Sequence, residues 1–174
     1  MALARLVHPL WRRVARTALR GRTPRSMLVV CYGNICRSPM AAALFRRALA
    51  GTGIEIGSAG FIGPGRGSPP EAVAVAAGAG VDLSGHRSRL LTPDLVRWAD
   101  LIVVMDAAQQ RRVVERFGRS WRDVIVLGDL DPAPIDGRTI RDPVNQTADV
   151  FEQCYARIER CVREFTRLLR NAGG

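Results

Sequence analysis

Four segments of the chain have the pattern of β-strands: three short apolar runs and one segment that follows a glycine-rich turn. The apolar runs are residues 27–30, 101–105 and 124–127, and each has the length and composition of a buried β-strand. A further strand is expected at residues 54–59, because the Gly-Thr-Gly sequence at 51–53 marks a turn just before it. These four segments are predicted to form one sheet.

Helical patterns fill much of the chain between and after these strands. The expected helices are residues 38–50, 71–79, 93–99, 107–117 and 148–170. This alternation predicts an α/β fold, a three-layer sandwich with helices on both sides of a four-stranded parallel sheet. Ligands of such sheets bind at the carboxyl ends of the strands, where Cys31, Gly60, Asp106 and Gly128 fall.

The segment after the first strand carries the candidate chemistry. Cys31 is followed six residues later by Arg37, with Gly33 and Asn34 between them and Ser38 opening a helix. A tight strand-to-helix turn directs backbone N–H groups and a helix N-terminus at one point, which binds an anion. Such donors also stabilise a thiolate, and a guanidinium can hold two phosphate oxygens at once. The pattern predicts a phosphate-binding loop with Cys31 as nucleophile.

Residues 1–26 differ from the rest, because they hold seven arginines and no acidic residue. An amphipathic helix is expected from Pro9 onward, with apolar side chains on one face and arginines on the other. The apolar side chains are Leu10, Trp11, Val14 and Ala18, and the arginines are Arg12, Arg13, Arg16 and Arg20. Leu3, Leu6 and Val7 would extend the apolar stripe backwards, but Pro9 argues against a continuous helix there.

The chain is therefore expected to consist of a basic amphipathic extension with its linker, residues 1–26, and a catalytic domain, residues 27–174. Several roles for the extension stay open. The helix docks on the domain with solvated arginines, or the segment is disordered. Alternatively it contacts a membrane surface or an acidic partner, or it is an organelle transit peptide.

Composition excludes several other classes of protein. The net charge is +10, but with the extension set aside the chain is close to neutral, so nucleic acid is not an expected partner. No apolar run approaches the roughly 20 residues of a membrane span. The four cysteines (Cys31, Cys36, Cys154 and Cys161) include no C-x2-C pair, and both histidines lie elsewhere, so neither a metal site nor another cofactor is predicted.

The loop itself is specific enough to suggest a family. The eleven residues from Cys31 to Ala41, CYGNICRSPMA, resemble the active-site loop of the bacterial low-molecular-weight protein tyrosine phosphatases. The likeness runs from about Met27 to Leu169 and includes Ser58-Ala59-Gly60, residues 82–89 and Arg141-Asp142-Pro143.

This resemblance implies hydrolysis of phosphotyrosine through a phosphocysteine on Cys31. Asp142 would be the general acid and base, because it precedes a proline before the last helix; Asp131, also followed by proline, is the alternative. The implied phosphate-binding residues are Tyr32, Gly33, Asn34, Ile35, Cys36, Arg37 and Ser38. Asn34, Ser58 and His86 would hold the loop. Independently of the resemblance, Cys36 is a candidate partner for a reversible disulfide with Cys31, which the sequence leaves open.

The expected substrate pocket departs from the family, because Tyr32, Phe61 and Val144 make it less aromatic. Three rival functions follow from the same scaffold. Arsenate reductases need further cysteines, which residues 80–100 lack, and arginine phosphatases carry threonine where this chain has Ile35. A non-catalytic phosphate-binding module would not need both Cys31 and Asp142.

The resemblance also suggests partners and a place of action. The expected partner is a phosphotyrosine protein, with a bacterial tyrosine autokinase as the specific suggestion. The expected location is the cytoplasm, with peripheral contact at the membrane through residues 1–26.

Overall fold

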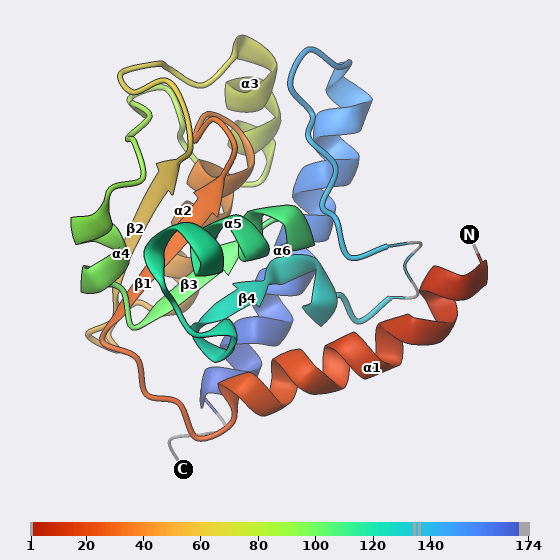
Figure 1. The fold of residues 1–174 in the computed structure, drawn as a ribbon. Coiled ribbons are helices and arrows are strands. Elements are labelled where there is room, and N and C mark those ends of the chain that lie inside the picture. The colour runs from red at the N-terminus through yellow and green to blue at the C-terminus, as the bar shows by residue number, and fades with distance from the viewer. Residues whose placement is uncertain (1, 134, 136, 171–174) are drawn as a thin grey trace.

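Four parallel strands form the centre of the molecule (Figure 1). They are β1 (Ser26–Cys31), β2 (Glu55–Gly60), β3 (Leu101–Val104) and β4 (Val124–Val126), in the spatial order β2-β1-β3-β4. The computed structural model describes residues 2–133, 135 and 137–170, with the backbone alone for residues 2–5. The predicted α/β sandwich with a four-stranded parallel sheet is confirmed.

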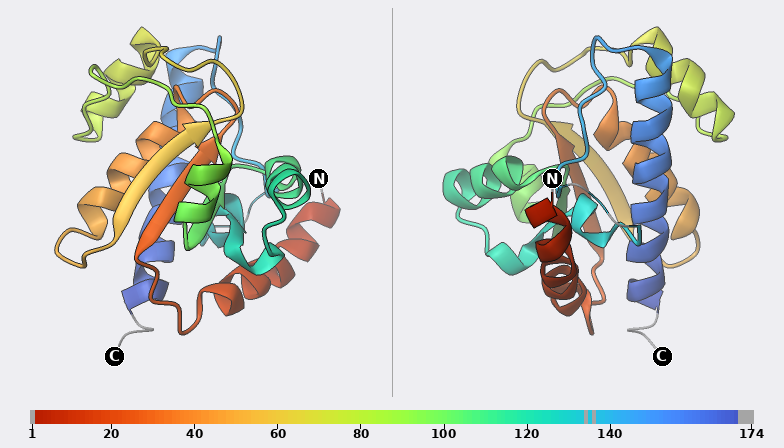
Figure 2. Two further views of the ribbon diagram at one scale, coloured as in Figure 1. Left: turned by 60° about the vertical axis from the view of Figure 1, so that its left-hand side comes forward. Right: turned by 90° about the vertical axis from the view of Figure 1, so that its right-hand side faces the viewer.

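Helices cover both faces of this sheet (Figure 2). The helices are α1 (Ala2–Leu19), α2 (Arg37–Ala48), α3 (Pro70–Gly78), α4 (Pro93–Trp98), α5 (Ala107–Phe117) and α6 (Ala148–Arg170), and the short 3-10 turns are η1 (Trp121–Asp123) and η2 (Leu127–Leu130). The expected helices at 107–117 and 148–170 are confirmed to the residue, and the others are displaced by one or two residues. None of the helices in the described part of the chain is long and apolar enough to cross a membrane.

Alternate strand residues supply two separate cores. Met27 and Val29 of β1 face α2 and α6, whereas Leu28 and Val30 face α4 and α5. Every side chain of β1 is buried, as expected for a central strand covered on both faces. The larger core, on the α2 and α6 side, includes the edge-to-face pair Phe45–Phe165 with ring centroids 5.0 Å apart.

The strand register sets the position of the cysteine loop, residues 31–37. Cys31 ends β1 directly opposite Gly60, which ends β2. The loops that follow these two strands therefore leave the sheet side by side at its carboxyl edge, which points to the top of Figure 1.

The first helix differs from expectation. It begins at Ala2 and continues through Pro9, so the expectation that Pro9 would begin it is wrong. Proline removes one backbone donor but not the rest of the ladder, and the side chain of Pro9 faces outward. The side chain of Leu3 lies outside the described residues.

This helix lies below the sheet in Figure 1 and contacts η2, β4 and α6. Ala15 and Leu19 of α1 belong to the larger core, and Leu19 is fully buried. Arg12 donates to Glu164 of α6 at 3.2 Å, and the guanidinium of Arg138 stacks 4.0 Å from the ring centre of Trp11. The described contacts agree with a helix docked on the domain.

If α1 is part of the folded domain, Leu19→Ala should destabilise the protein by about 2–5 kcal/mol, the range for truncating a buried leucine. The melting temperature should then fall by roughly 5–15 °C. Leu10→Ala, on the exposed side of the same helix, is the matched control and should stay within about 0.5 kcal/mol of wild type. Equal melting temperatures for the two variants would mean that α1 is an independent appendage.

Candidate active site

The cysteine loop surrounds the Cys31 thiol with donors. The amide N–H of Asn34 donates to Cys31 Sγ at 3.2 Å, and the hydroxyl of Ser38 donates to it at 3.0 Å. Among the hydrogen bonds of the described residues, none uses the amide N–H of Gly33, Ile35 or Cys36. These amides belong to the turn that leads into the N-terminus of α2, so the loop combines a donor-rich nest with the positive end of a helix.

Asn34 holds the loop in shape. Its backbone is in the left-handed region, with φ at 51°, which asparagine tolerates better than most residues. Its side-chain amide donates to the hydroxyls of Ser38 (2.9 Å) and Ser58 (3.0 Å), and its side-chain oxygen accepts from the Arg89 amide at 2.8 Å. The side chain is fully buried. One residue therefore connects the loop to α2, to β2 and to the segment before α4.

His86 supports the same residue through a hydrogen bond to its backbone. Its Nε2 lies 2.7 Å from the carbonyl oxygen of Asn34, and because a carbonyl can only accept, Nε2 carries the hydrogen. The structure thus brings together Asn34, Ser58 and His86, the three residues that the resemblance assigned to loop support.

Gly60 lies so close to the cysteine loop that no side chain would fit there, an approach that the sequence did not predict. A Cβ atom placed there would lie 2.7 Å from the amide nitrogen of Asn34 and 2.9 Å from the carbonyl carbon of Gly33. Both neighbours are backbone, so neither can move without distorting the loop. Its place at the end of a strand, opposite Cys31, was the available signal.

Arg37 and Asp142 meet beside the loop. The guanidinium of Arg37 is buried; one terminal nitrogen donates to the carbonyl of Ile140 at 3.1 Å and the other pairs with the Asp142 carboxylate. Its Nε–H is buried and finds no acceptor among the described residues. The Asp142 side chain is 41% exposed. The buried cation and the accessible carboxylate both belong to the carboxyl edge of the sheet.

Asp131, the alternative acid, has a different environment. It is fully buried and accepts from Arg157 at 3.1 Å and from Arg160 at 3.1 and 3.2 Å, both on α6. Arg157 also donates to the carbonyls of Gly137 (2.7 Å) and Thr139 (2.8 Å). This cluster anchors the segment that leads to Asp142.

The remaining thiols are held in their protonated form. All four cysteines are described, and none forms a disulfide. Burial, reinforced by the nearby Cys31, raises the pKa of Cys36 far above that of an ordinary thiol. Burial also raises the pKa of Cys154 and of Cys161 to about 12. The structure contains the expected neighbours Cys31 and Cys36 as separate thiols.

The three expected pocket residues lie in different environments. Tyr32 is 48% exposed at the mouth of the loop, and Val144 is half-buried two residues after Asp142. Phe61 instead packs in the smaller core, 7% exposed, with the guanidinium of Arg112 4.5 Å from its ring centre. Its neighbour Ile62 is instead an exposed apolar side chain of that segment.

Arg66, on the loop after β2, also comes close to the cysteine loop, through contacts that the sequence did not predict. Its guanidinium donates to the carbonyl of Gly33 at 3.1 Å and to that of Gly63 at 3.0 Å. The buried Ser88 fixes this segment by accepting from the Arg66 amide and donating to the Gly63 carbonyl. No pattern in the sequence pointed to these contacts, since they join two irregular loops.

Metal-ligand residues do not gather in this part of the molecule or elsewhere in its described part. No group of three or more His, Cys, Asp or Glu side chains there is arranged to hold an ion.

Comparison with known proteins places this site in a family. Residues 26–173 match the family described as low molecular weight phosphotyrosine protein phosphatase. The probable low molecular weight protein-tyrosine-phosphatase EpsP of Ralstonia solanacearum is 43% identical over 151 residues, covering 86% of this chain and 99% of that protein.

Solved structures share the fold as well. The tyrosine phosphatase AmsI of Erwinia amylovora superposes with a TM-score of 0.76 at 32% identity, over 84% of this chain and 94% of that one. The YwlE arginine phosphatase of Geobacillus stearothermophilus superposes with a TM-score of 0.75 at 29% identity, over 84% and 93%. From the family match and the 43% identity, we conclude that the chain belongs to the low molecular weight phosphotyrosine protein phosphatase family.

Proposed function

We propose that this protein is a protein-tyrosine phosphatase that hydrolyses aryl phosphate monoesters through a phosphocysteine on Cys31. The observation that carries the proposal is the convergence on one thiol of two donors, Asn34 N–H and Ser38 Oγ–H, beside a buried arginine. These donors stabilise the thiolate, which is the nucleophilic form.

The first step is an in-line displacement at phosphorus. The Cys31 thiolate forms a bond to phosphorus while the bond to the aryl oxygen breaks, and Asp142 gives its proton to the departing oxygen. Arg37 and the amides of residues 32–37 stabilise the three equatorial oxygens as charge develops on them. The Nε–H of Arg37, which has no acceptor among the described residues, is one of the donors on offer.

The second step reverses these roles. Water attacks the phosphorus of the phosphocysteine, the Asp142 carboxylate takes the proton of that water, and the sulfur leaves as thiolate with release of inorganic phosphate. The Arg37–Asp142 ion pair in the structure implies that a bound phosphate competes for the guanidinium. That competition frees the Asp142 carboxyl to act as acid.

We assign the acid role to Asp142 rather than Asp131 because of burial and pairing. Asp131 has no exposed surface and is engaged by two arginines, whereas the Asp142 side chain is partly open to solvent next to Arg37. Asp131 is therefore suited to anchoring the segment that leads to Asp142, and Asp142 to exchanging protons.

For the biological substrate we propose a phosphotyrosine protein, specifically a bacterial tyrosine autokinase, in the cytoplasm. Tyr32 and Val144 would flank the aromatic ring, and Ile62 would replace Phe61 as the apolar side chain of the third wall. This assignment uses the exposure of Tyr32 and Ile62 and the burial of Phe61.

Substitution of the assigned residues tests the mechanism with p-nitrophenyl phosphate. Cys31→Ser should abolish turnover, and Asp142→Ala should lower kcat about 10²–10⁴-fold, the usual contribution of a general acid. Asp131→Asn is the control: it should lower the melting temperature while leaving kcat of the folded protein close to wild type. Turnover by Cys31→Ser, or a larger loss of kcat in Asp131→Asn than in Asp142→Ala, would contradict the assignment.

Selective alkylation tests whether Cys31 is the reactive thiol. Iodoacetamide near neutral pH should label one cysteine per chain, because burial raises the pKa of Cys154 and Cys161 to about 12 and that of Cys36 further still. Inorganic phosphate should slow the labelling, and Cys31→Ser should remove it. Mass spectrometry of peptides locates the label; modification of Cys154 at the same rate would refute the interpretation.

Similarity to YwlE makes arginine phosphatase the second candidate, and Ile35 distinguishes the two. Its apolar side chain lies at the edge of the larger core and offers no hydrogen bond to a guanidinium. The wild type should therefore prefer a phosphotyrosine peptide to phosphoarginine. Ile35→Thr should lower the ratio of the two kcat/KM values by at least about tenfold. A wild-type preference for phosphoarginine would overturn the tyrosine assignment, and Ile35→Val controls for the change in volume.

A further inference from the structure

Helix α1 leaves one side of its apolar stripe uncovered. Leu6, Leu10 and Val14 follow one another at a spacing of four residues and are 75%, 60% and 52% exposed. The neighbouring flank of the same stripe, with Ala15 and Leu19, is buried against the domain. Docking therefore uses only part of the apolar surface of α1.

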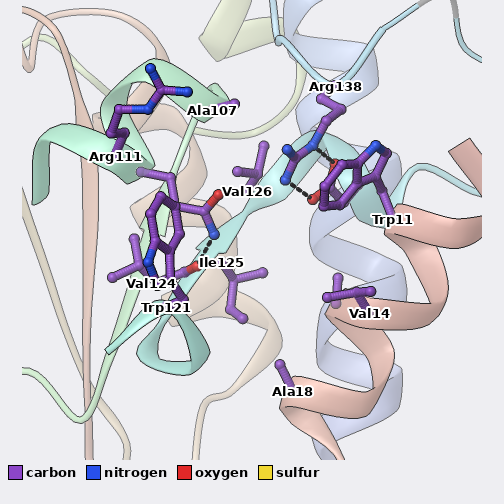
Figure 3. Close-up of a pocket in the computed structure, with 13 residues that line it drawn as sticks. Trp11, Val14, Ala18, Ala107, Arg111, Trp121, Val124, Ile125, Val126 and Arg138 are labelled. Carbon is purple, nitrogen blue, oxygen red and sulfur yellow. Dashed lines mark hydrogen bonds and ion pairs between the residues drawn. The ribbon is translucent and has the colours of Figure 1, made fainter. Parts of the chain in front are cut away.

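Trp121 extends this uncovered surface onto the domain. It lies on η1, is 53% exposed, and faces Val14 and Ala18 of α1 across a hollow of about 390 Å³ (Figure 3). The same three residues also line a second, adjoining hollow of about 620 Å³. An exposed tryptophan and a row of aliphatic side chains thus form one continuous apolar strip.

Arginines flank this strip, whereas the acidic residues nearest to it, Asp123 and Asp129, are each paired with an arginine. The larger hollow is lined by Arg13, Arg20, Arg22 and Arg122, with no acidic residue among its lining. Arg13, Arg20 and Arg122 form no ion pair with any residue that the structure describes. We call the strip and its arginines the α1 face: Leu6, Leu10, Arg13, Val14, Arg20, Trp121 and Arg122.

We propose that the α1 face binds the surface of an anionic lipid bilayer. An amphipathic helix that lies in the membrane interface combines an apolar row with flanking cations. Tryptophan is enriched at that depth, and arginines beside it are attracted to anionic headgroups. The uncovered row spans about 12 Å along α1, at 1.5 Å per residue.

The shape of the face favours a bilayer over an acidic protein. Leu6 and Leu10 are the most exposed members of the row, and their helix lies at the edge of the molecule (Figure 2). Leu6 lines neither hollow and Leu10 lines only the larger one, so the N-terminal end of the row projects beyond the smaller hollow. A projecting row enters a lipid interface, whereas a peptide would need the apolar residues at the floor of a groove.

Docking in this way leaves the cysteine loop accessible. Helix α1 lies below the sheet in Figure 1, whereas the carboxyl ends of β1 and β2 point to the opposite side. The loop would then face away from the bilayer toward cytoplasmic substrates. This orientation rests on the proposed phosphatase function, but the binding itself does not.

Sedimentation of the full chain with vesicles tests the proposal. The protein should pellet with phosphatidylcholine vesicles that contain phosphatidylglycerol, pellet poorly with phosphatidylcholine alone, and dissociate as salt is raised. Leu6→Ser combined with Leu10→Ser should weaken binding, and Leu90→Ser, at an exposed leucine away from the face, should not.

The charge of the face is tested in the same way. Arg13→Gln combined with Arg20→Gln should weaken vesicle binding about tenfold or more. The control, Arg97→Gln combined with Arg163→Gln, removes the same charge elsewhere and should leave binding unchanged.

Fluorescence locates the contact. Anionic vesicles should shift the tryptophan emission to shorter wavelength in the wild type and in Trp98→Phe. The shift should be smaller in Trp121→Phe, in which Trp11 of α1 remains. Hydrolysis of p-nitrophenyl phosphate should be the same in every variant, so loss of vesicle binding with full activity separates this proposal from the mechanism.

Three results would overturn the membrane assignment: equal pelleting with both vesicle types, unchanged pelleting of the leucine double variant, or an emission shift in Trp121→Phe as large as in the wild type. Binding of an acidic protein to the α1 face without vesicle binding would also overturn it, and would assign the face to a protein partner.

Discussion

The hydrogen bonds of Asn34 are the constraint on which the active site depends. Its left-handed backbone turns the chain so that its own amide points at Cys31, and its side chain reaches three other segments at once. A buried amide that makes these bonds is costly to disturb, because any donor or acceptor left unpaired keeps its desolvation penalty. The surroundings of the Cys31 thiol therefore depend on how the Asn34 side chain ties the loop to its neighbours, as well as on the loop backbone.

Arginine has a comparable role in placing Asp142. The chain contains no lysine, and the planar guanidiniums of Arg138, Arg157 and Arg160 satisfy the buried carboxylates of Asp129 and Asp131. Arg138 and Arg160 each donate two hydrogen bonds to one carboxylate in a fixed plane, which an ammonium could not do. Because Arg157 also holds the carbonyls of Gly137 and Thr139, helix α6 fixes the start of the segment that carries Asp142.

The same type of contact ties α1 to this segment. Arg138 donates two hydrogen bonds to Asp129 at 2.8 Å while its guanidinium lies over the ring of Trp11. Helix α1 thus packs against the region before Asp142 with one flank and presents its remaining apolar surface to solvent with the other. Its position outside the matched family range, which begins at residue 26, makes it a feature added to the shared domain.

The sequence by itself determined the fold class, the order of strands and helices along the chain, and the position of the cysteine loop. Those features depend on local periodicity and on one contiguous motif, from Cys31 to Ala41, which no tertiary contact is needed to recognise. Tertiary structure decided what depends on contacts between distant segments: the close approach of Gly60 to Asn34, the burial of Phe61 under Arg112, and the pairing of Asp131 with α6. It also decided which flank of α1 is buried, because a helical stripe wider than its docking site does not specify which of its residues the domain will cover.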